Sequence, residues 1–202
     1  YNSIKSGNLF PLYDPMWYNG VELLRYWSPL PAYVMALCQF IAGGSQFGAY
    51  LVFVGGVCFF GACVWPFIGR GFNRPLLGAF IGLLWFFMPN NLYAVFIEGN
   101  LARSLSMIFL PVFIYAVYKY LENQRLRYVL LMVFTFVLIA LCHLGYAGMI
   151  AIAVILYGIV YMFQGGKKKA VLDVIISMII GFMLRVIWMV ASLRGGIRSL
   201  DN

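Results

Sequence analysis

Residues 88–103 read Met-Pro-Asn-Asn-Leu-Tyr-Ala-Val-Phe-Ile-Glu-Gly-Asn-Leu-Ala-Arg, and this polar stretch separates two long apolar segments. It holds a carboxylate, Glu98, then a helix-starting Gly99-Asn100 pair, then Arg103 in the first turn of the helix that follows. Because both flanking segments are apolar enough to lie in hydrocarbon, the stretch should emerge at a membrane surface. We interpret it as one edge of a functional site at that surface.

The composition of the chain is that of an integral membrane protein. Of its 202 residues, 64% are hydrophobic and 10% are charged, whereas soluble domains are about half apolar and about a quarter charged. The net charge of +8 is concentrated in short connections between apolar segments, a pattern typical of topology signals. Since no basic face of a folded domain is readable, we expect the lipid bilayer as a partner and no nucleic acid.

The apolar segments predict an all-α bundle of about six spanning helices and one short helix. Residues 1–46 form a polar and aromatic outer loop, in which residues 32–42 are apolar for about half of the ~20 residues needed to cross hydrocarbon. We expect that short helix to lie at the membrane interface, and residues 194–202 to begin a further outer loop. The predicted spans are residues 47–68, 76–97, 100–121, 128–142, 149–163 and 171–193.

The basic residues predict how the bundle is oriented. Clusters at 70–74, 119–127 and 167–169 are separated by even numbers of predicted spans, so they share one side, and Lys and Arg in short connections mark the cytoplasmic side. The connections 89–100 and 143–148 then face outward. The outer loop faces outward as well, provided that its short helix does not span.

This orientation gathers the candidate site residues near the outer face. Arg103 lies at the positive end of a helix dipole, so an anion should lie beside it: either Glu98 in a structural ion pair or a phosphate, and the two are compatible. Asp14 either begins a short helix as its N-cap or acts as a general base or metal ligand.

Two further candidates each have two interpretations. His143, the only histidine, is either a hydrogen-bonded interface residue or a ligand for a phosphate oxygen or a sugar. Arg185 lies in the outer third of the last predicted span, where it either extends toward the headgroups or has a functional partner. No Gly-rich nucleotide loop, Cys/His metal set or serine triad is readable, so we do not expect chemistry driven by a soluble nucleotide.

Four stretches, which together cover most of the chain, carry a family resemblance. They are Gly7-Asn-Leu-Phe-Pro11 with Asp14-Pro-Met-Trp17, then Trp27-Ser-Pro-Leu-Pro-Ala-Tyr33, then Glu98-Gly-Asn-Leu-Ala-Arg103 with Pro111, and then Leu141-Cys-His-Leu144. In this order they resemble the bacterial polytopic membrane proteins known as 6-pyruvoyl-tetrahydropterin synthase-related, a label that does not imply pterin chemistry. Those proteins are similar to the GT-C class of lipid-linked sugar transferases.

The resemblance implies an inverting sugar transfer on the outer face of the bacterial plasma membrane. The donor would be a polyprenyl-phosphate sugar, and the acceptor a hydroxyl of a glycan, lipid or protein. Asp14 and Glu98 would be the catalytic carboxylates, with Arg103, His143 and Arg185 binding phosphate or substrate. The cofactor stays open, with a divalent cation such as Mg²⁺ or Mn²⁺ as the candidate.

The same resemblance implies a first transmembrane helix and a key acid upstream of Tyr1, so we expect the chain to be a fragment. The alternative function is a non-catalytic transporter, flippase-like subunit or scaffold in cell-surface glycan assembly. A transporter should carry interrupted helices and charges near the bilayer midplane. Here the polar groups gather at one surface instead, which favours the transferase.

Overall fold

The computed structural model describes residues 1–8 and 28–198, with side chains described up to residue 186 and at residue 190. All regular secondary structure in these residues is helical, which confirms the predicted all-α fold class. The helices are α1 (Asn2–Lys5), α3 (Pro29–Ile41), α4 (Gln46–Gly71), α5 (Pro75–Phe86), α6 (Pro89–Leu92), the π-helix η1 (Tyr93–Ile97), α7 (Leu101–Asn123), α8 (Leu126–Cys142), α9 (Leu144–Phe163) and α10 (Lys168–Arg198).

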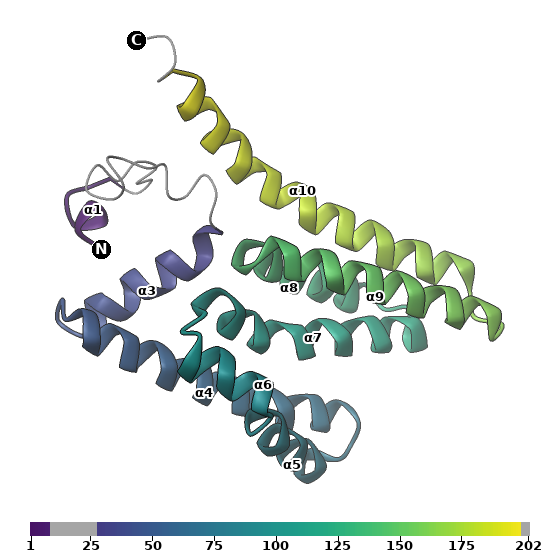
Figure 1. Ribbon diagram of the computed structural model, residues 1–202. Helices are drawn as coiled ribbons and strands as arrows, with labels where there is room; N and C mark the ends of the chain where they lie inside the picture. Colours follow the sequence, from purple (N-terminus) through teal and green to yellow (C-terminus); the bar gives the residue numbers. More distant parts are fainter. Residues whose placement is uncertain (9–27, 199–202) are drawn as a thin grey trace.

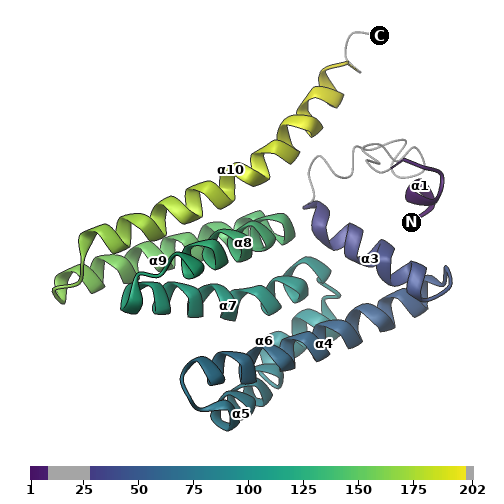
Figure 2. The same cartoon turned by 180° about the vertical axis from the view of Figure 1, so that it is seen from behind.

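The helices form two groups that meet at α7. Helices α7 to α10 lie side by side, with α8 packed against both α7 and α10, and α3, α4 and α5 form a series of hairpins along the other side of α7 (Figures 1 and 2). The larger core lies inside the first group, where Phe113, Met132 and Ile139 are fully buried. A second core joins Cys38 and Phe53 of the hairpins to Leu105 of α7 and to the end of α8.

The α4–α5 hairpin is held by direct contact between two backbones. A Cβ atom added at Gly78 would overlap the Trp65 carbonyl oxygen and would lie 2.9 Å from the Gly69 Cα. Small residues allow helices to approach this closely, which is the main way helices pack in a membrane. The hairpin therefore depends on the absence of side chains at these two glycines.

Among the described residues, three helices, α4, α7 and α9, are long and apolar enough to cross a membrane. A fourth span results if α5 and the α6–η1 segment, which bend by 57° at Met88, form one broken crossing. Helix α8 has 17 residues and α10 has 31. The total of six spans, and the interfacial position of the short helix that appears as α3, stay predictions. Large apolar side chains such as Leu76 and Phe163, 86% and 88% exposed, fit a lipid-facing surface.

The connections between helices divide between two ends of the bundle. The α4–α5, α7–α8 and α9–α10 connections lie together at one end in both views, and the η1–α7 loop and the α8–α9 junction lie toward the other (Figures 1 and 2). The three basic clusters all belong to the first group of connections, so we call it the basic end. The second we call the site end. This arrangement agrees with the shared side that the sequence predicts for the basic clusters.

Candidate functional site

The segment between α5 and α7 is anchored by two hydrogen bonds to residues outside it. Pro89, which has no N–H to donate, begins a new short helix after the break. The Asn91 side-chain amide then donates to the Trp85 carbonyl oxygen at 2.7 Å, and so satisfies a carbonyl in the last turn of α5. On the other side, the Tyr50 hydroxyl of α4 donates to the Val95 carbonyl oxygen in η1 at 3.0 Å.

The turn into α7 places Arg103 against this segment. Gly99 adopts a φ of +59°, a left-handed conformation that side-chain-bearing residues rarely adopt. Asn100 follows as the N-cap, and its Oδ1 accepts a hydrogen bond from the Arg103 backbone N–H at 3.0 Å. The helix starts at the Gly-Asn pair that the sequence indicates.

The Arg103 guanidinium bridges two parts of the segment. Its Nη1 lies 3.2 Å from Glu98 Oε2, and its Nη2 donates to Asn90 Oδ1. The two charged side chains are 19% and 33% exposed, so the pair is partly hydrated and its contribution to stability is on the order of 0–1 kcal/mol. A guanidinium carries five N–H donors, and these two contacts leave donors for a further oxygen ligand. The structural ion pair that we expected is present, and it is compatible with anion binding.

His143 is the N-cap of α9. Its Nδ1 accepts a hydrogen bond from the Tyr146 backbone N–H at 3.1 Å, and its ring meets the Tyr146 ring edge-on at 6.0 Å. A ring nitrogen that accepts an N–H bond carries no proton, so the ring's own donor is Nε2–H. Because this cap starts α9 at Leu144, the helix begins earlier than the predicted boundary at residue 149.

The α8–α9 junction lies next to the first turns of α7. Cys142, the last residue of α8, is fully buried in the same core cluster as Leu105 of α7. Ser106 lies one helical turn beyond Arg103, and its hydroxyl donates to the Ala102 carbonyl oxygen at 2.8 Å. The described contacts thus unite Glu98 with Arg103 and place His143 at the adjoining helix end, but they do not join His143 directly to the ion pair.

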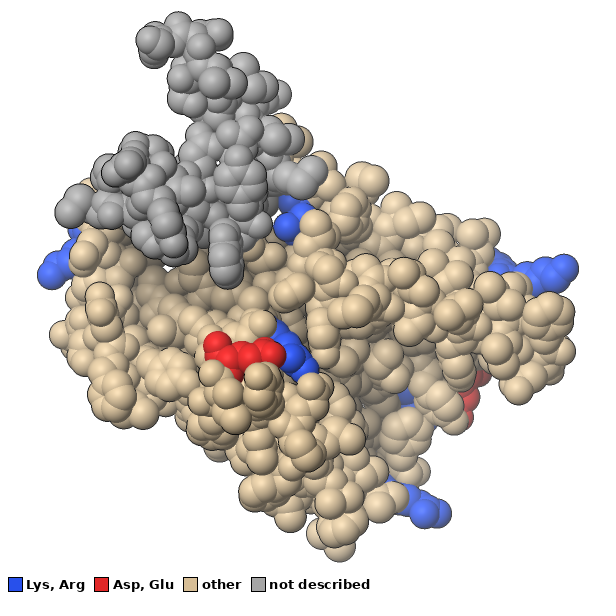
Figure 3. All heavy atoms as spheres, viewed as in Figure 1, with Lys and Arg blue, Asp and Glu red and all other residues tan. Residues whose placement is uncertain are grey.

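Arg185 lies on α10 at the level of the last turns of α8. Gly181 packs against Phe136, with a distance of 3.0 Å from an added Cβ to Phe136 Cδ1, and Arg185 follows one turn later toward the site end. Its Nε and Nη1 atoms are buried and have no hydrogen-bond partner among the described residues. Charged side chains are sparse on the face of the molecule that Figure 3 shows. A buried arginine without a partner for two of its nitrogens among the described residues is therefore unusual in this molecule.

Two expectations from the sequence remain, the role of Asp14 and a site for a divalent cation. Asp14 lies outside the described residues. Within residues 1–8 and 28–198, no three His, Cys, Asp or Glu side chains lie close enough to hold a metal ion.

The comparison with known proteins decides the family. A family model described as the 6-pyruvoyl-tetrahydropterin synthase related domain, a membrane protein, matches residues 24–202. The chain belongs to this family. No curated protein and no solved structure matches it.

Two residues that shape the site are not among the candidates that the sequence indicates. Asn90 lies in the polar stretch 88–103 without a predicted role, yet its side chain is the second partner of the Arg103 guanidinium. Tyr50 belongs to an apolar segment, and nothing in its neighbours indicates a hydrogen bond 45 residues away. For Asn90, the two consecutive asparagines after a proline were a usable signal, because an amide side chain offers both a hydrogen-bond acceptor and donors.

Proposed function

We propose that this family member is a membrane glycosyltransferase, or a transferase-like relative. It moves a sugar from a polyprenyl-phosphate donor to an acceptor hydroxyl outside the plasma membrane. The observation that carries the proposal is the placement of Arg103. This cation sits in the first turn of α7, held by Glu98 and Asn90, at the end of the bundle opposite the basic connections. A cation joined to a helix N-terminus is suited to bind a phosphate.

The proposed reaction is a single displacement at the anomeric carbon. The acceptor oxygen forms the new bond to that carbon as the bond to the phosphate oxygen breaks, and the polyprenyl phosphate leaves with the bonding electrons. The acceptor proton passes to a carboxylate, for which Asp14 is the candidate. No step is assigned to a metal ion.

The cations act on the leaving group. Arg103 donates N–H groups to the departing phosphate, where negative charge increases in the transition state. Glu98 positions the guanidinium through its contact with Nη1. His143 can add its Nε2–H donor from the adjoining helix end, and Arg185 supplies a cation whose Nε and Nη1 have no hydrogen-bond partner among the described residues.

The test measures sugar transfer by the full-length protein in membranes. Polyprenyl phosphates carrying [¹⁴C]mannose or [¹⁴C]glucose serve as donors, and labelled glycan is counted after extraction of the free donor. Arg103→Ala should lower the rate by about 100-fold, as expected for loss of one donor to a developing charge. Arg103→Lys should retain part of the rate, because it keeps the charge but loses the fork of donors.

Arg125→Ala is the matched control, because Arg125 is an exposed arginine at the basic end. Its rate should equal that of the wild type. If the wild-type protein transfers no sugar from these donors, the proposal is overturned in favour of a non-catalytic component. If Arg103→Ala transfers sugar at the same rate as Arg125→Ala and the wild type, the role assigned to Arg103 is wrong. Each variant should first be shown to elute from a sizing column as the wild type does.

A further inference from the structure

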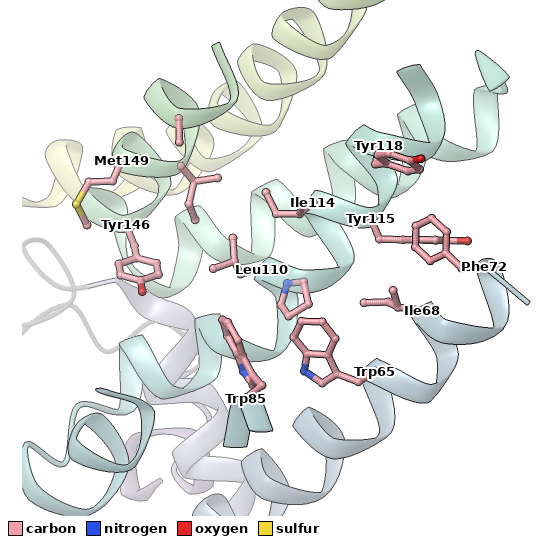
Figure 4. Close-up of a pocket in the computed structure, with 13 residues that line it drawn as sticks. Trp65, Ile68, Phe72, Trp85, Leu110, Ile114, Tyr115, Tyr118, Tyr146 and Met149 are labelled. Atoms are coloured by element: carbon pink, nitrogen blue, oxygen red, sulfur yellow. The ribbon is translucent and has the colours of Figure 1, made fainter. Parts of the chain in front are cut away.

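A large apolar cavity lies between the two groups of helices. It has a volume of about 690 Å³, within the range of roughly 300–1,000 Å³ typical of ligand sites. Trp65 and Trp85 form one wall, and α7 and α9 contribute the facing side chains, among them Ile114 and Met149 (Figure 4). None of the described residues that line it is charged.

The cavity is open at the surface of the molecule that faces lipid. Three of its wall residues, Ile114, Tyr118 and Met149, are 47%, 46% and 59% exposed. Along α7 it extends from Leu110 to Tyr118, which is ~12 Å at 1.5 Å per residue. That length is close to the ~15 Å of hydrocarbon in one leaflet. The cavity therefore matches one lipid chain in polarity and in length.

Two cations, Lys119 and Arg127, lie near one end of this cavity. Phe72, Tyr115 and Tyr118 line that end (Figure 4), and Lys119 Nζ lies 4.5 Å from the centre of the Phe72 ring. The Tyr115 ring also meets the Tyr128 ring edge-on at 6.2 Å, and the Arg127 guanidinium lies 4.7 Å from the centre of that second ring. Lys119 thus contacts a ring of the cavity wall directly, and Arg127 is separated from the wall by the Tyr128 ring.

The charge around this end is strongly positive. Lys119 pairs with Glu122 at 2.8 Å, which neutralises one cation, and Asp173 is held by the Tyr120 hydroxyl. Against these two acids, the three connections carry eight of the 14 Lys and Arg residues of the chain. They are Arg70, Arg74, Lys119, Arg125, Arg127, Lys167, Lys168 and Lys169.

We propose that the cavity binds one acyl chain of an anionic phospholipid, whose headgroup lies at Lys119 and Arg127 in the leaflet of the basic end. The apolar walls take the chain, and the surrounding positive charge selects the anionic headgroup. The headgroup end of this lipid site lies at the opposite end of the bundle from Arg103, and the other end of the cavity reaches Tyr146, whose ring meets the His143 ring. The lipid proposal does not rest on the proposed sugar transfer, and either proposal can fail alone.

The first test measures lipid selectivity. The full-length protein is reconstituted in nanodiscs of equal parts dioleoyl phosphatidylglycerol and dioleoyl phosphatidylcholine, and the lipid retained after release into mild detergent is counted by native mass spectrometry. The wild type should retain phosphatidylglycerol in preference. Lys119→Gln with Arg127→Gln should reduce this preference by about fivefold per removed cation. Lys167→Gln, an exposed cation of the same end, should leave it within twofold.

The second test fills the cavity. Ala153 lies in its wall, whereas Ala151 on the same helix faces a smaller cavity between α8, α9 and α10. Ala153→Phe should abolish retention of phosphatidylglycerol, and Ala151→Phe should leave it at the wild-type level. Equal retention of the two lipids by the wild type, or unchanged retention by Ala153→Phe, overturns the proposal.

A third test measures fluorescence quenching in the wild-type protein, whose cavity is unaltered. Phosphatidylglycerol with brominated acyl chains should quench the fluorescence of Trp65, identified as the component that Trp65→Phe removes. Brominated phosphatidylcholine should quench that component less. If neither brominated lipid quenches it, a protein segment of the full-length chain covers the cavity, and the lipid proposal is wrong.

Discussion

The Tyr120 hydroxyl donates a hydrogen bond to Asp173 Oδ2 at 2.6 Å and so joins α7 to α10 across the core of the bundle. Tyr120 is 7% exposed, and removal of its hydroxyl would leave a partly buried carboxylate without that donor. We expect Tyr120→Phe to lower the free energy of unfolding by about 1–3 kcal/mol. Thermal unfolding in detergent measures this. Tyr118→Phe, at a position 46% exposed, is the control and should unfold as the wild type does.

The backbone contact between α4 and α5 can be tested with two glycines. Gly78→Ala would drive a methyl group into the Trp65 carbonyl, so the hairpin must separate, and overpacking of this kind costs roughly 1–3 kcal/mol. An added Cβ at Gly56, also helical, meets nothing within 4 Å, so Gly56→Ala should be neutral or slightly stabilising. Equal midpoints for the two variants in thermal unfolding would show that the hairpin is not closely packed.

His143 has a capping role that can be separated from a role in binding. Asparagine is a good N-cap, so His143→Asn should keep α9 stable, whereas His143→Ala should lose about 0.5–2 kcal/mol. If the imidazole also binds substrate, His143→Asn should raise the KM for the lipid-linked sugar while the unfolding midpoint stays unchanged. If His143→Asn has the wild-type KM, His143 acts only as the N-cap of α9.

The orientation of the bundle is testable by cysteine labelling in intact cells. Gln124→Cys and Gln164→Cys lie in connections of the basic end, and we expect a membrane-impermeant maleimide to leave both unlabelled. Ile97→Cys, at a position 72% exposed beside Glu98, should be labelled. Labelling of all three from the same side would refute the proposed separation of the two ends.

Much of the architecture follows from the sequence, because the physics that sets it is local. Lengths of apolar segments and the proline at position 89 determine where helices begin and break, and Asn100 has the residue type and position of an N-cap. The pairing of Glu98 with Arg103 was also predictable, since five residues and a glycine turn separate them.

The interactions that the sequence does not reveal are those between distant segments. The contact of Gly78 with Trp65, the bond from Tyr50 to Val95 and the bond from Tyr120 to Asp173 each join separate helices. Which side chains meet across such an interface depends on the rotation of each helix about its axis. Hydrophobic periodicity determines that rotation poorly when the helix is apolar on every side.

The contrast between the two ends of the bundle bears on how mutation would affect the protein. If the eight cations in three separate connections set the orientation, as we predict, they do so redundantly, and the loss of any one should leave insertion unchanged. The site end has no such reserve: one arginine, one glutamate and one asparagine depend on each other through single contacts. Substitutions should therefore be tolerated well at the basic end and poorly at the site end.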